Sequence, residues 1–348
     1  MYISNRNVGP DAPPFVIAEL SGNHGGSLEQ AMALIDAAAA GGADAIKLQT
    51  YTADTMTIDA QGNDFLIDDP NSLWHGSYLY DLYGKAHTPW EWHQPLFDKA
   101  KELGMLAFST PFDATAVDFL EGLDVPCYKV ASFENTDIPL IQKVAATGKP
   151  MIISCGMATQ EEIGEAVDAA RSAGAEHICL LQCTSSYPAD PRDANLATIG
   201  DLRERFDVLV GVSDHTLGTA VPTAAVAMGA CVIEKHIVLK RGGDEVDGEF
   251  SLEPDELKQM VDAANIAWQA KGHVSYGTAS DAEAASKQFR RSIYVVKDIQ
   301  AGEPFSEDNI RCIRPGFGLK PKHFASTLGK PASCNLTRGT ALQQEHIG

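Results

Sequence analysis

A chain of 348 residues, 44% of them hydrophobic, is ordinary for a globular protein but too long for one small domain. It has no run of 18 apolar residues, and residues 1–11 lack the apolar stretch of a secretory signal, so we expect neither a transmembrane helix nor a leader. The formal net charge of −20 argues against binding to nucleic acid or anionic membranes, so an anionic ligand would need a local cluster of cations.

Short β-rich segments alternate with longer amphipathic segments over residues 15–272. The first helix is expected at residues 28–40, with Ser27 as its N-cap. An aromatic and polar insertion at residues 51–88 is typical of an active-site loop, and Pro89 is expected to open a helix that continues to Leu103. Strands are expected at residues 15–18, 44–49, 105–108, 126–131, 151–154, 177–182, 208–212 and 231–235.

Eight strands separated by crossovers predict an α/β fold, a (β/α)8 TIM barrel of about 250 residues. A doubly wound open sheet is the main alternative, but no glycine fingerprint follows the first strand. Beyond Gly272 the sequence becomes polar and rich in small residues, and then β-rich with many glycines. We therefore expect a catalytic barrel at residues 1–272, a linker at 273–288 and a small β-rich module at 289–348.

The seven cysteines are odd in number and show no CxxC spacing. Cys127, Cys179, Cys183 and Cys231 lie in apolar, strand-like segments. This pattern favours buried reduced thiols and a cytoplasmic protein.

Two histidines follow neighbouring expected strands. His215 comes after the strand at 208–212 and His236 after the strand at 231–235, a separation of about one strand-helix-strand unit. Because parallel strands end at one rim, two neutral imidazoles would meet there and form half of a divalent-metal site, with room for water and substrate. The alternative is that each histidine is a hydrogen-bonded core or surface residue.

Nearly every expected strand brings a polar side chain to the same rim. Lys47 and Lys129 lie within apolar segments, where an unpaired ammonium group is costly to desolvate. Each lysine could snorkel to the surface or pair with a structural carboxylate. We favour a functional interpretation, in which two cations and several hydroxyls converge on phosphate and carboxylate oxygens. Such a rim suits phosphoenolpyruvate, with a carbonyl compound polarised at the metal as its partner.

Three carboxylates complete the predicted site. Glu19 and Glu134 are the candidates for moving protons or steering water. Asp247 follows the last strand, where it could hold sugar hydroxyls or be a solvated loop residue.

Short motifs stand at the expected strand ends: Glu19-Leu20-Ser21-Gly22-Asn23-His24, Ile46-Lys47-Leu48-Gln49-Thr50, Ser109-Thr110-Pro111-Phe112, Tyr128-Lys129-Val130-Ala131-Ser132-Phe133-Glu134, Cys183-Thr184-Ser185-Ser186-Tyr187-Pro188, Val212-Ser213-Asp214-His215 and Ile233-Glu234-Lys235-His236. Together they resemble the sialic acid synthase family. The tail, with Ile313-Arg314-Pro315-Gly316, resembles that family's SAF (antifreeze-like, β-clip) domain.

The resemblance implies a transferase that condenses phosphoenolpyruvate with an open-chain acetamido sugar. Water attacks C2 of the intermediate, phosphate leaves by C–O cleavage, and a nine-carbon 2-keto acid results. It also implies that His215 and His236 hold Mn²⁺ or Mg²⁺, and that Arg314 reaches from the tail of one subunit into the barrel mouth of the other in a swapped homodimer. The implied ligands of phosphoenolpyruvate are Lys47, Thr110, Lys129, Ser132, Ser154, Ser185 and Ser213, and those of the sugar are Gln49, Tyr187, Asp247 and Arg314.

Residues 73–83 and 88–93 resemble the branch of the family that makes pseudaminic acid from 2,4-diacetamido-2,4,6-trideoxy-L-altrose. Their aromatic rings offer apolar surface to a deoxy sugar. The N-acetylneuraminate and legionaminate branches, which share the chemistry, stay open. So do two other classes of protein, a pyruvate lyase with a Schiff base on Lys129 or Lys47 and a non-enzymatic carbohydrate-binding protein.

Overall fold

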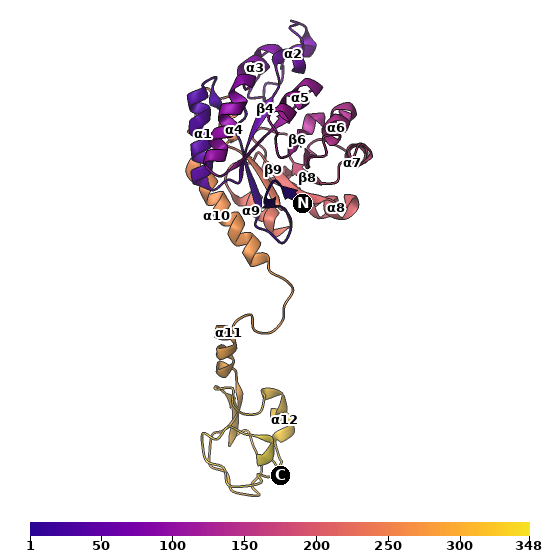
Figure 1. The fold of residues 1–348 in the computed structure, drawn as a ribbon. Coiled ribbons are helices and arrows are strands. Elements are labelled where there is room, and N and C mark those ends of the chain that lie inside the picture. Colours follow the sequence, from indigo (N-terminus) through magenta and orange to yellow (C-terminus); the bar gives the residue numbers. More distant parts are fainter. The chain divides into compact units, whose positions relative to one another are not determined.

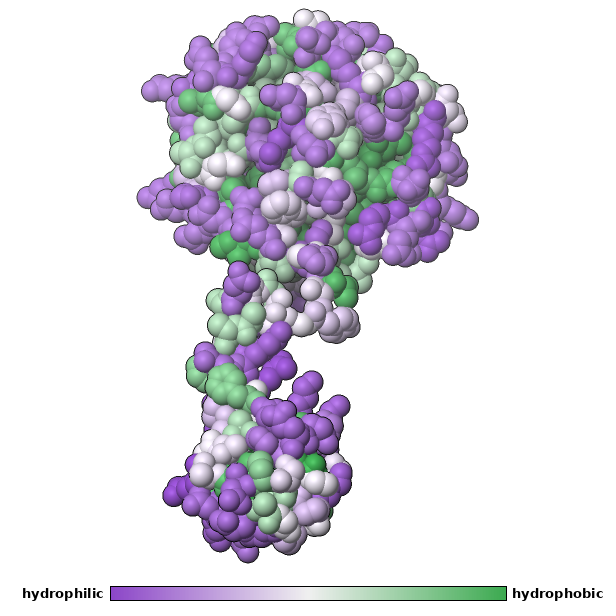
Figure 2. Space-filling view, turned by 60° about the horizontal axis from the view of Figure 1, so that its bottom comes forward, coloured by the Kyte–Doolittle hydropathy of each residue, from purple (hydrophilic) through white to green (hydrophobic). Residues whose placement is uncertain are grey.

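The computed structural model describes residues 1–348, apart from the side chain of Asn63. The chain divides into two compact units, Met1–Gly272 and His273–Gly348. Among the described residues, no helix combines the length and apolar character needed to cross a membrane. Hydrophilic side chains cover most of the visible surface of each unit (Figure 2).

The first unit is built on a closed barrel of eight parallel strands, which confirms the predicted (β/α)8 architecture over the open-sheet alternative. The strands pair in the order β10-β3-β4-β5-β6-β7-β8-β9, so the last strand closes against the first. Their bounds are β3 Phe15–Glu19, β4 Ala45–Thr50, β5 Leu106–Pro111, β6 Tyr128–Val130, β7 Met151–Ser154, β8 Ile178–Cys183, β9 Leu209–Asp214 and β10 Val232–His236.

Helices surround this barrel (Figure 1), one after nearly every strand. Ser27 caps the first one, because its hydroxyl accepts a hydrogen bond from the backbone N–H of Gln30 at 3.2 Å. The helix expected at Pro89 begins later: residues Trp90–Trp92 form a tighter 3-10 turn, and α4 starts at His93. The bounds are α1 Leu28–Gly41, α4 His93–Glu102, α5 Ala114–Gly122, α6 Ile138–Ala145, α7 Gln160–Ser172, α8 Thr198–Phe206, α9 Ala220–Ala227 and α10 Pro254–Lys271.

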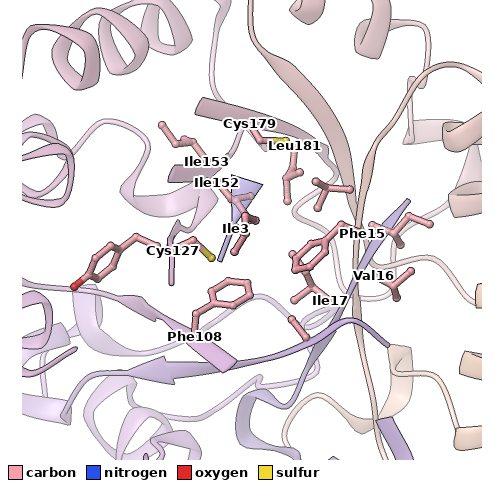
Figure 3. Packing of buried hydrophobic residues seen from close by; sticks show 14 of the residues in the cluster. Ile3, Phe15, Val16, Ile17, Phe108, Cys127, Ile152, Ile153, Cys179 and Leu181 are labelled. Atoms are coloured by element: carbon pink, nitrogen blue, oxygen red, sulfur yellow. The ribbon is translucent and has the colours of Figure 1, made fainter. Parts of the chain in front are cut away.

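The amino-terminal end of the barrel is filled with apolar side chains. A two-stranded hairpin, β1 Tyr2–Ile3 and β2 Arg6–Asn7, precedes the barrel. Its Ile3 is fully buried and lies among Phe15, Phe108 and Cys127 in Figure 3. Burial of such side chains is the main source of barrel stability. The polar residues lie toward the carboxyl ends of the strands, which is where TIM barrels have their active sites.

The insertion between β4 and α4 has secondary structure of its own. It contains two short helices, α2 Ala53–Met56 and α3 Leu79–Ala86. Thr52 caps α2 by accepting from the N–H of Thr55 at 3.3 Å. The insertion follows β4 directly, so it begins at the rim that carries the predicted site.

The second unit is a small β-rich body. Its strands β11 Ser292–Val295 and β12 Ile310–Ile313 pair antiparallel. They cover a core of eight buried residues, which includes Phe305 and Leu342. Residues 273–288, expected as a linker, contain the short helix α11 Asp281–Ala285, and α12 Phe324–Thr327 follows later in the chain.

Candidate active site

Two buried lysines and two buried glutamates meet inside the barrel. Lys47 on β4 forms an ion pair with Glu19 on β3, and its Nζ donates a hydrogen bond to Thr110 Oγ1 at 3.0 Å. Glu234 on β10 lies 3.6 Å from the same Nζ. Burial alone would lower the pKa of Lys47, but attraction to Glu19 and Glu234 outweighs it and raises the pKa, so this lysine is a cation at neutral pH.

Lys129 on β6 has mostly neutral partners. Its Nζ donates to Ser154 Oγ at 2.6 Å and to Val130 O at 3.0 Å, and Glu234 Oε1 lies 3.9 Å away. Burial lowers the pKa of Lys129, and Glu234 opposes this shift. Thus neither lysine snorkels to the surface. Both are held inward, within reach of hydroxyl groups predicted to bind phosphoenolpyruvate.

Two serine hydroxyls lie close around Gly156, which follows Ser154 by two positions. The backbone N–H of Gly156 donates to Ser132 Oγ at 3.1 Å. A Cβ atom at Gly156 would overlap the hydroxyl oxygens of Ser132 and Ser185, so a residue other than glycine would displace them. Ser213 Oγ donates instead to Glu234 Oε1 at 3.0 Å. The structure therefore brings five predicted hydroxyl ligands of phosphoenolpyruvate near the two predicted lysine ligands, Lys47 and Lys129; the five are Thr110, Ser132, Ser154, Ser185 and Ser213.

The two histidines face each other at adjacent strand ends, with ring centroids 5.3 Å apart. His215 Nδ1 lies 2.9 Å from the carbonyl oxygen of Thr184. Because a carbonyl only accepts, Nδ1 carries a proton. Burial would lower the pKa of His215, but its contact with Cys183 outweighs burial and raises the pKa, so binding of a metal at Nε2 competes with protonation there. Burial and the neighbouring His215 hold the pKa of His236 well below its usual value, so that ring is neutral near pH 7.

The histidine pair fits a divalent cation in part. His236 Nδ1 is buried and has no hydrogen-bond partner, and Asp247 Oδ2 lies 3.9 Å from it. Within the described part of the chain, no group of three or more His, Cys, Asp or Glu side chains is arranged to hold a metal. Two imidazoles suit a borderline ion once both are neutral. A cation bound here would take two ligands from these histidines and its other ligands from water and substrate.

Glu134 follows β6 in a 3-10 turn, Ser132–Glu134, and contacts the site from the side of Lys129. Its Oε2 is buried without a hydrogen-bond partner. Burial raises the pKa of Glu134 to about 7, with Lys129 opposing the shift. A carboxyl group that titrates near neutrality can give and take a proton during turnover. Glu19, by contrast, is engaged with Lys47 in this structure.

A cavity of about 360 Å³ opens next to the histidines. Its polar lining includes four predicted residues, Gln49, Glu134, His236 and Asp247. Tyr187, also predicted, packs at a tilted angle between His215 and Trp74, with ring centroids 4.7 Å and 5.6 Å away. The rest of the lining is largely apolar, and most of that apolar wall comes from the insertion: Met56, Ile67, Trp74, Leu79, Leu82 and Tyr83.

Asp247 is buried and fixed, so it is not a solvated loop residue. Its carboxylate accepts a hydrogen bond from Ser21 Oγ, and its backbone N–H donates to Asn23 Oδ1 at 3.1 Å. The amide of Asn23 in turn donates to Ile237 O and Ser251 Oγ. Burial raises the pKa of Asp247, and the bond from Ser21 opposes the rise. The carboxylate therefore faces the cavity in one orientation.

Arg314 is the predicted site residue that lies outside the first unit. It follows β12 in the second unit and is exposed. Its predicted contact with sugar needs a second subunit and stays a prediction.

Sequence reasoning missed two contributors to the site. Glu234 precedes His236 by two positions on β10, so both side chains point to the same face of the strand. A glutamate in an apolar segment was as conspicuous as Lys47 and could have been found by the same argument. Asn23 acts through a contact with Asp247, more than 220 positions away, which no local pattern reveals. Trp74 belongs to the aromatic stretch at residues 73–83 that was expected to meet the sugar, and it lines the cavity.

Comparisons with known proteins agree with this geometry. The model of the NeuB family matches residues 34–276, and that of the SAF domain matches residues 290–348. The chain belongs to the NeuB family. The SAF match lies within the second unit.

Relatives in the NeuB family are similar over nearly their whole length. A pseudaminic acid synthase of Campylobacter jejuni subsp. jejuni serotype O:2 is 44% identical over 344 residues, which cover 99% of either chain. A pseudaminic acid synthase of Helicobacter pylori is 41% identical and covers 96% of this chain and 98% of its own. Among solved structures, the N-acetylneuraminic acid synthetase of Leptospira borgpetersenii in complex with citrate aligns with a TM-score of 0.73 at 31% identity, over 83% of this chain and 95% of that chain.

Proposed function

We propose that this chain condenses phosphoenolpyruvate with 2,4-diacetamido-2,4,6-trideoxy-L-altrose to give pseudaminic acid and phosphate. The observation that carries the proposal is the buried arrangement of Lys47 and Lys129 beside a paired imidazole site. Two cations and a set of hydroxyls match the phosphate and carboxylate of a small trianion. The named activity of the Campylobacter and Helicobacter relatives supports the choice of product.

The proposed chemistry assigns a task to each group. Lys47, Lys129 and the serine hydroxyls bind the phosphate and carboxylate and hold C3 of phosphoenolpyruvate toward the sugar. A Mn²⁺ or Mg²⁺ ion held by His215 and His236 would supply Lewis acidity at the aldehyde oxygen of the open-chain sugar. C3 of phosphoenolpyruvate bonds to the aldehyde carbon as the carbonyl π bond breaks, and the former carbonyl oxygen takes up a proton. Water adds at C2 and gives up a proton, and the C2–O bond breaks to release phosphate. Glu134, whose pKa is about 7, can give the first proton and take the second.

The lining of the cavity supports a deoxy sugar. Gln49 and Asp247 offer hydrogen bonds on one side, while Trp74, Leu79 and Leu82 from the insertion offer apolar surface. A sugar whose C6 is a methyl group, and which carries two acetamido methyls, has more apolar surface to bury than N-acetylmannosamine. We therefore propose that the insertion selects the substrate.

A phosphate-release assay tests the proposal. Purified protein is incubated with phosphoenolpyruvate, Mn²⁺ and one of three sugars: the altrose derivative, the legionaminate precursor or N-acetylmannosamine. We expect phosphate release with the altrose derivative at the highest kcat/KM. Equal or better turnover of N-acetylmannosamine would overturn the choice of sugar. Absence of phosphate release with every sugar, from protein that binds phosphoenolpyruvate, would overturn the reaction.

The proposal includes a swapped homodimer in which Arg314 of the partner subunit meets the sugar. Charge supports it: residues 290–348 carry nine Lys and Arg against five Asp and Glu, while residues 1–289 carry 18 against 42. A cationic module and a strongly acidic barrel attract each other at moderate salt. Several exposed apolar residues, Phe133, Met157 and Leu217, stand on loops that follow barrel strands and would gain from being covered.

We also propose that the enzyme acts in the cytoplasm. Five cysteines are free and buried: Cys127, Cys155, Cys179, Cys183 and Cys231. Free thiols persist where the redox environment is reducing.

A further inference from the structure

Glu234 occupies an unusual place in the site. Its side chain is almost fully buried, and its two oxygens face two different lysines: Oε2 lies 3.6 Å from Lys47 Nζ, and Oε1 lies 3.9 Å from Lys129 Nζ. The two lysines come from β4 and β6, and Glu234 comes from β10. One carboxylate therefore acts on both cations across the interior of the barrel.

The two lysines depend on Glu234 to different degrees. Lys47 has a second carboxylate partner, Glu19. In the described part of the chain, Glu234 is the one carboxylate within 4 Å of Lys129 Nζ. The closer partners of Lys129, Ser154 and the backbone of Val130, are neutral. Removing the charge of Glu234 would thus leave Lys129 with neutral partners alone.

Glu234 is also held loosely. Its distances to both ammonium groups exceed the 2.7–3.2 Å of a normal hydrogen bond. Oε1 accepts one hydrogen bond, from Ser213, and Oε2 has no hydrogen-bond partner. The neighbouring pair on the other face of β10 is different: Lys235 Nζ lies 2.5 Å from Asp214 Oδ2, as expected of a closed structural ion pair. An ammonium group near Glu234 can therefore turn to another anion without breaking a short contact with Glu234 itself.

We propose that Glu234 is a positioning residue, which directs the ammonium groups of Lys47 and Lys129 toward one anion position. When the phosphate-bearing substrate binds, its anionic oxygens replace Glu234 as the partner of these ammonium groups. This inference rests on the proposed use of phosphoenolpyruvate. It makes Glu234 a part of substrate binding that acts through the two lysines and touches no substrate atom itself.

Two physical models make opposite predictions for Glu234→Gln. If Glu234 acted only as a negative charge close to an anion site, its removal would strengthen the binding of phosphoenolpyruvate. If Glu234 positions the lysines, its removal weakens the binding of phosphoenolpyruvate, because the two ammonium groups are no longer held toward one anion position. We expect the dissociation constant of phosphoenolpyruvate to rise at least tenfold, and KM for the sugar to change less than twofold.

The measurement is calorimetric titration of phosphoenolpyruvate into full-length dimeric or monomeric protein in the presence of EDTA, so that no metal contributes. Wild type must bind first; a wild type that does not bind phosphoenolpyruvate refutes the proposed function itself. Asp36→Asn is the matched control, since it removes a carboxylate paired with a lysine, Lys99, at 2.6 Å on the outer helices. Unchanged or tighter binding by Glu234→Gln would overturn the positioning role.

A double-mutant cycle shows whether Glu234 acts through Lys129. In a Lys129→Met background, we expect Glu234→Gln to weaken phosphoenolpyruvate binding by a smaller factor than in wild type, because only Lys47, which also has Glu19 as a partner, remains to be positioned. Glu234→Asp, which keeps the charge but shortens the side chain by one methylene, should fall between wild type and Glu234→Gln. Glu234→Asp is also the variant to measure if Glu234→Gln does not fold. Additive effects in the cycle, or Asp as damaging as Gln where both fold, would contradict the inference.

Discussion

Glu134 links catalysis to stability through its pKa, and the variant Glu134→Gln separates the two. In the folded protein burial raises this pKa from 4.5 to about 7. Between these values the folded state binds more protons than the unfolded state, so the contribution of Glu134 to the free energy of unfolding falls as pH rises. Glu134 destabilises the folded state least below pH 4.5, and its destabilising effect is complete above pH 7.

The size of this cost follows from the shift. The rise of the pKa from 4.5 to about 7 corresponds to a destabilisation of at most about 3 kcal/mol, at about 1.36 kcal/mol per pKa unit. Because the side chain is partly exposed, solvent screening lowers the expected cost to about 1–2 kcal/mol. A glutamine of the same shape carries no charge to desolvate. We therefore expect Glu134→Gln to raise Tm by about 2–8 °C at pH 8.5, and by much less at pH 5.

Thermal unfolding at pH 5 and pH 8.5 measures the stability effect, and phosphate release measures activity. The variant should be nearly inactive at both pH values, and the wild-type kcat/KM profile should contain a limb near pH 7 that the variant lacks. Glu165→Gln, on the exposed side of α7, controls for the loss of one negative charge. A Tm change of Glu134→Gln that is equal at the two pH values, or lower at pH 8.5, would refute the reasoning.

Four further predictions address other parts of the site. His236→Ala should abolish turnover with an unchanged circular dichroism spectrum, and EDTA should do the same to wild type until Mn²⁺ or Mg²⁺ is restored; full activity in the variant would remove the metal proposal. Gly156→Ala should raise KM for phosphoenolpyruvate at least tenfold, because the added methyl group overlaps two serine hydroxyls and overpacking costs about 1–3 kcal/mol. An unchanged KM would show that these hydroxyls do not bind phosphoenolpyruvate. Trp74→Ala should raise KM for the sugar but not for phosphoenolpyruvate, and a parallel rise in both would contradict a sugar-specific wall. Arg314→Ala should lower kcat/KM at least tenfold with the barrel's Tm unaltered, and a wild-type rate would count against the swapped dimer.

The barrel strands were predictable because each carries a local signal. A short β-branched segment, followed by a polar residue and then an amphipathic helix, placed all eight strands within one to three residues of their observed bounds. The polar residues at the strand ends were visible in the same way, Lys47 and Gln49 after one apolar segment and Ser213 and His215 after another.

Other parts of the site depend on contacts that no local pattern encodes. Asn23 braces the loop of Asp247 over more than 220 positions of sequence, and only the closure of β10 against β3 brings them together. The pairing of Lys47 with Glu19 likewise follows from the register of β3 and β4. The aromatic stretch at residues 73–83 indicated a surface for the sugar, but the contact of Trp74 with Tyr187, more than 110 positions away, had no signal in the sequence.

The insertion at residues 51–88 has a consequence for how such enzymes diversify. It supplies most of the apolar wall of the cavity, yet the eight strands that hold the lysines and histidines lie outside it. Evolution, or a protein engineer, can therefore exchange this one continuous stretch between related synthases and retarget the enzyme to a new carbohydrate, while the machinery that handles the three-carbon donor is inherited intact.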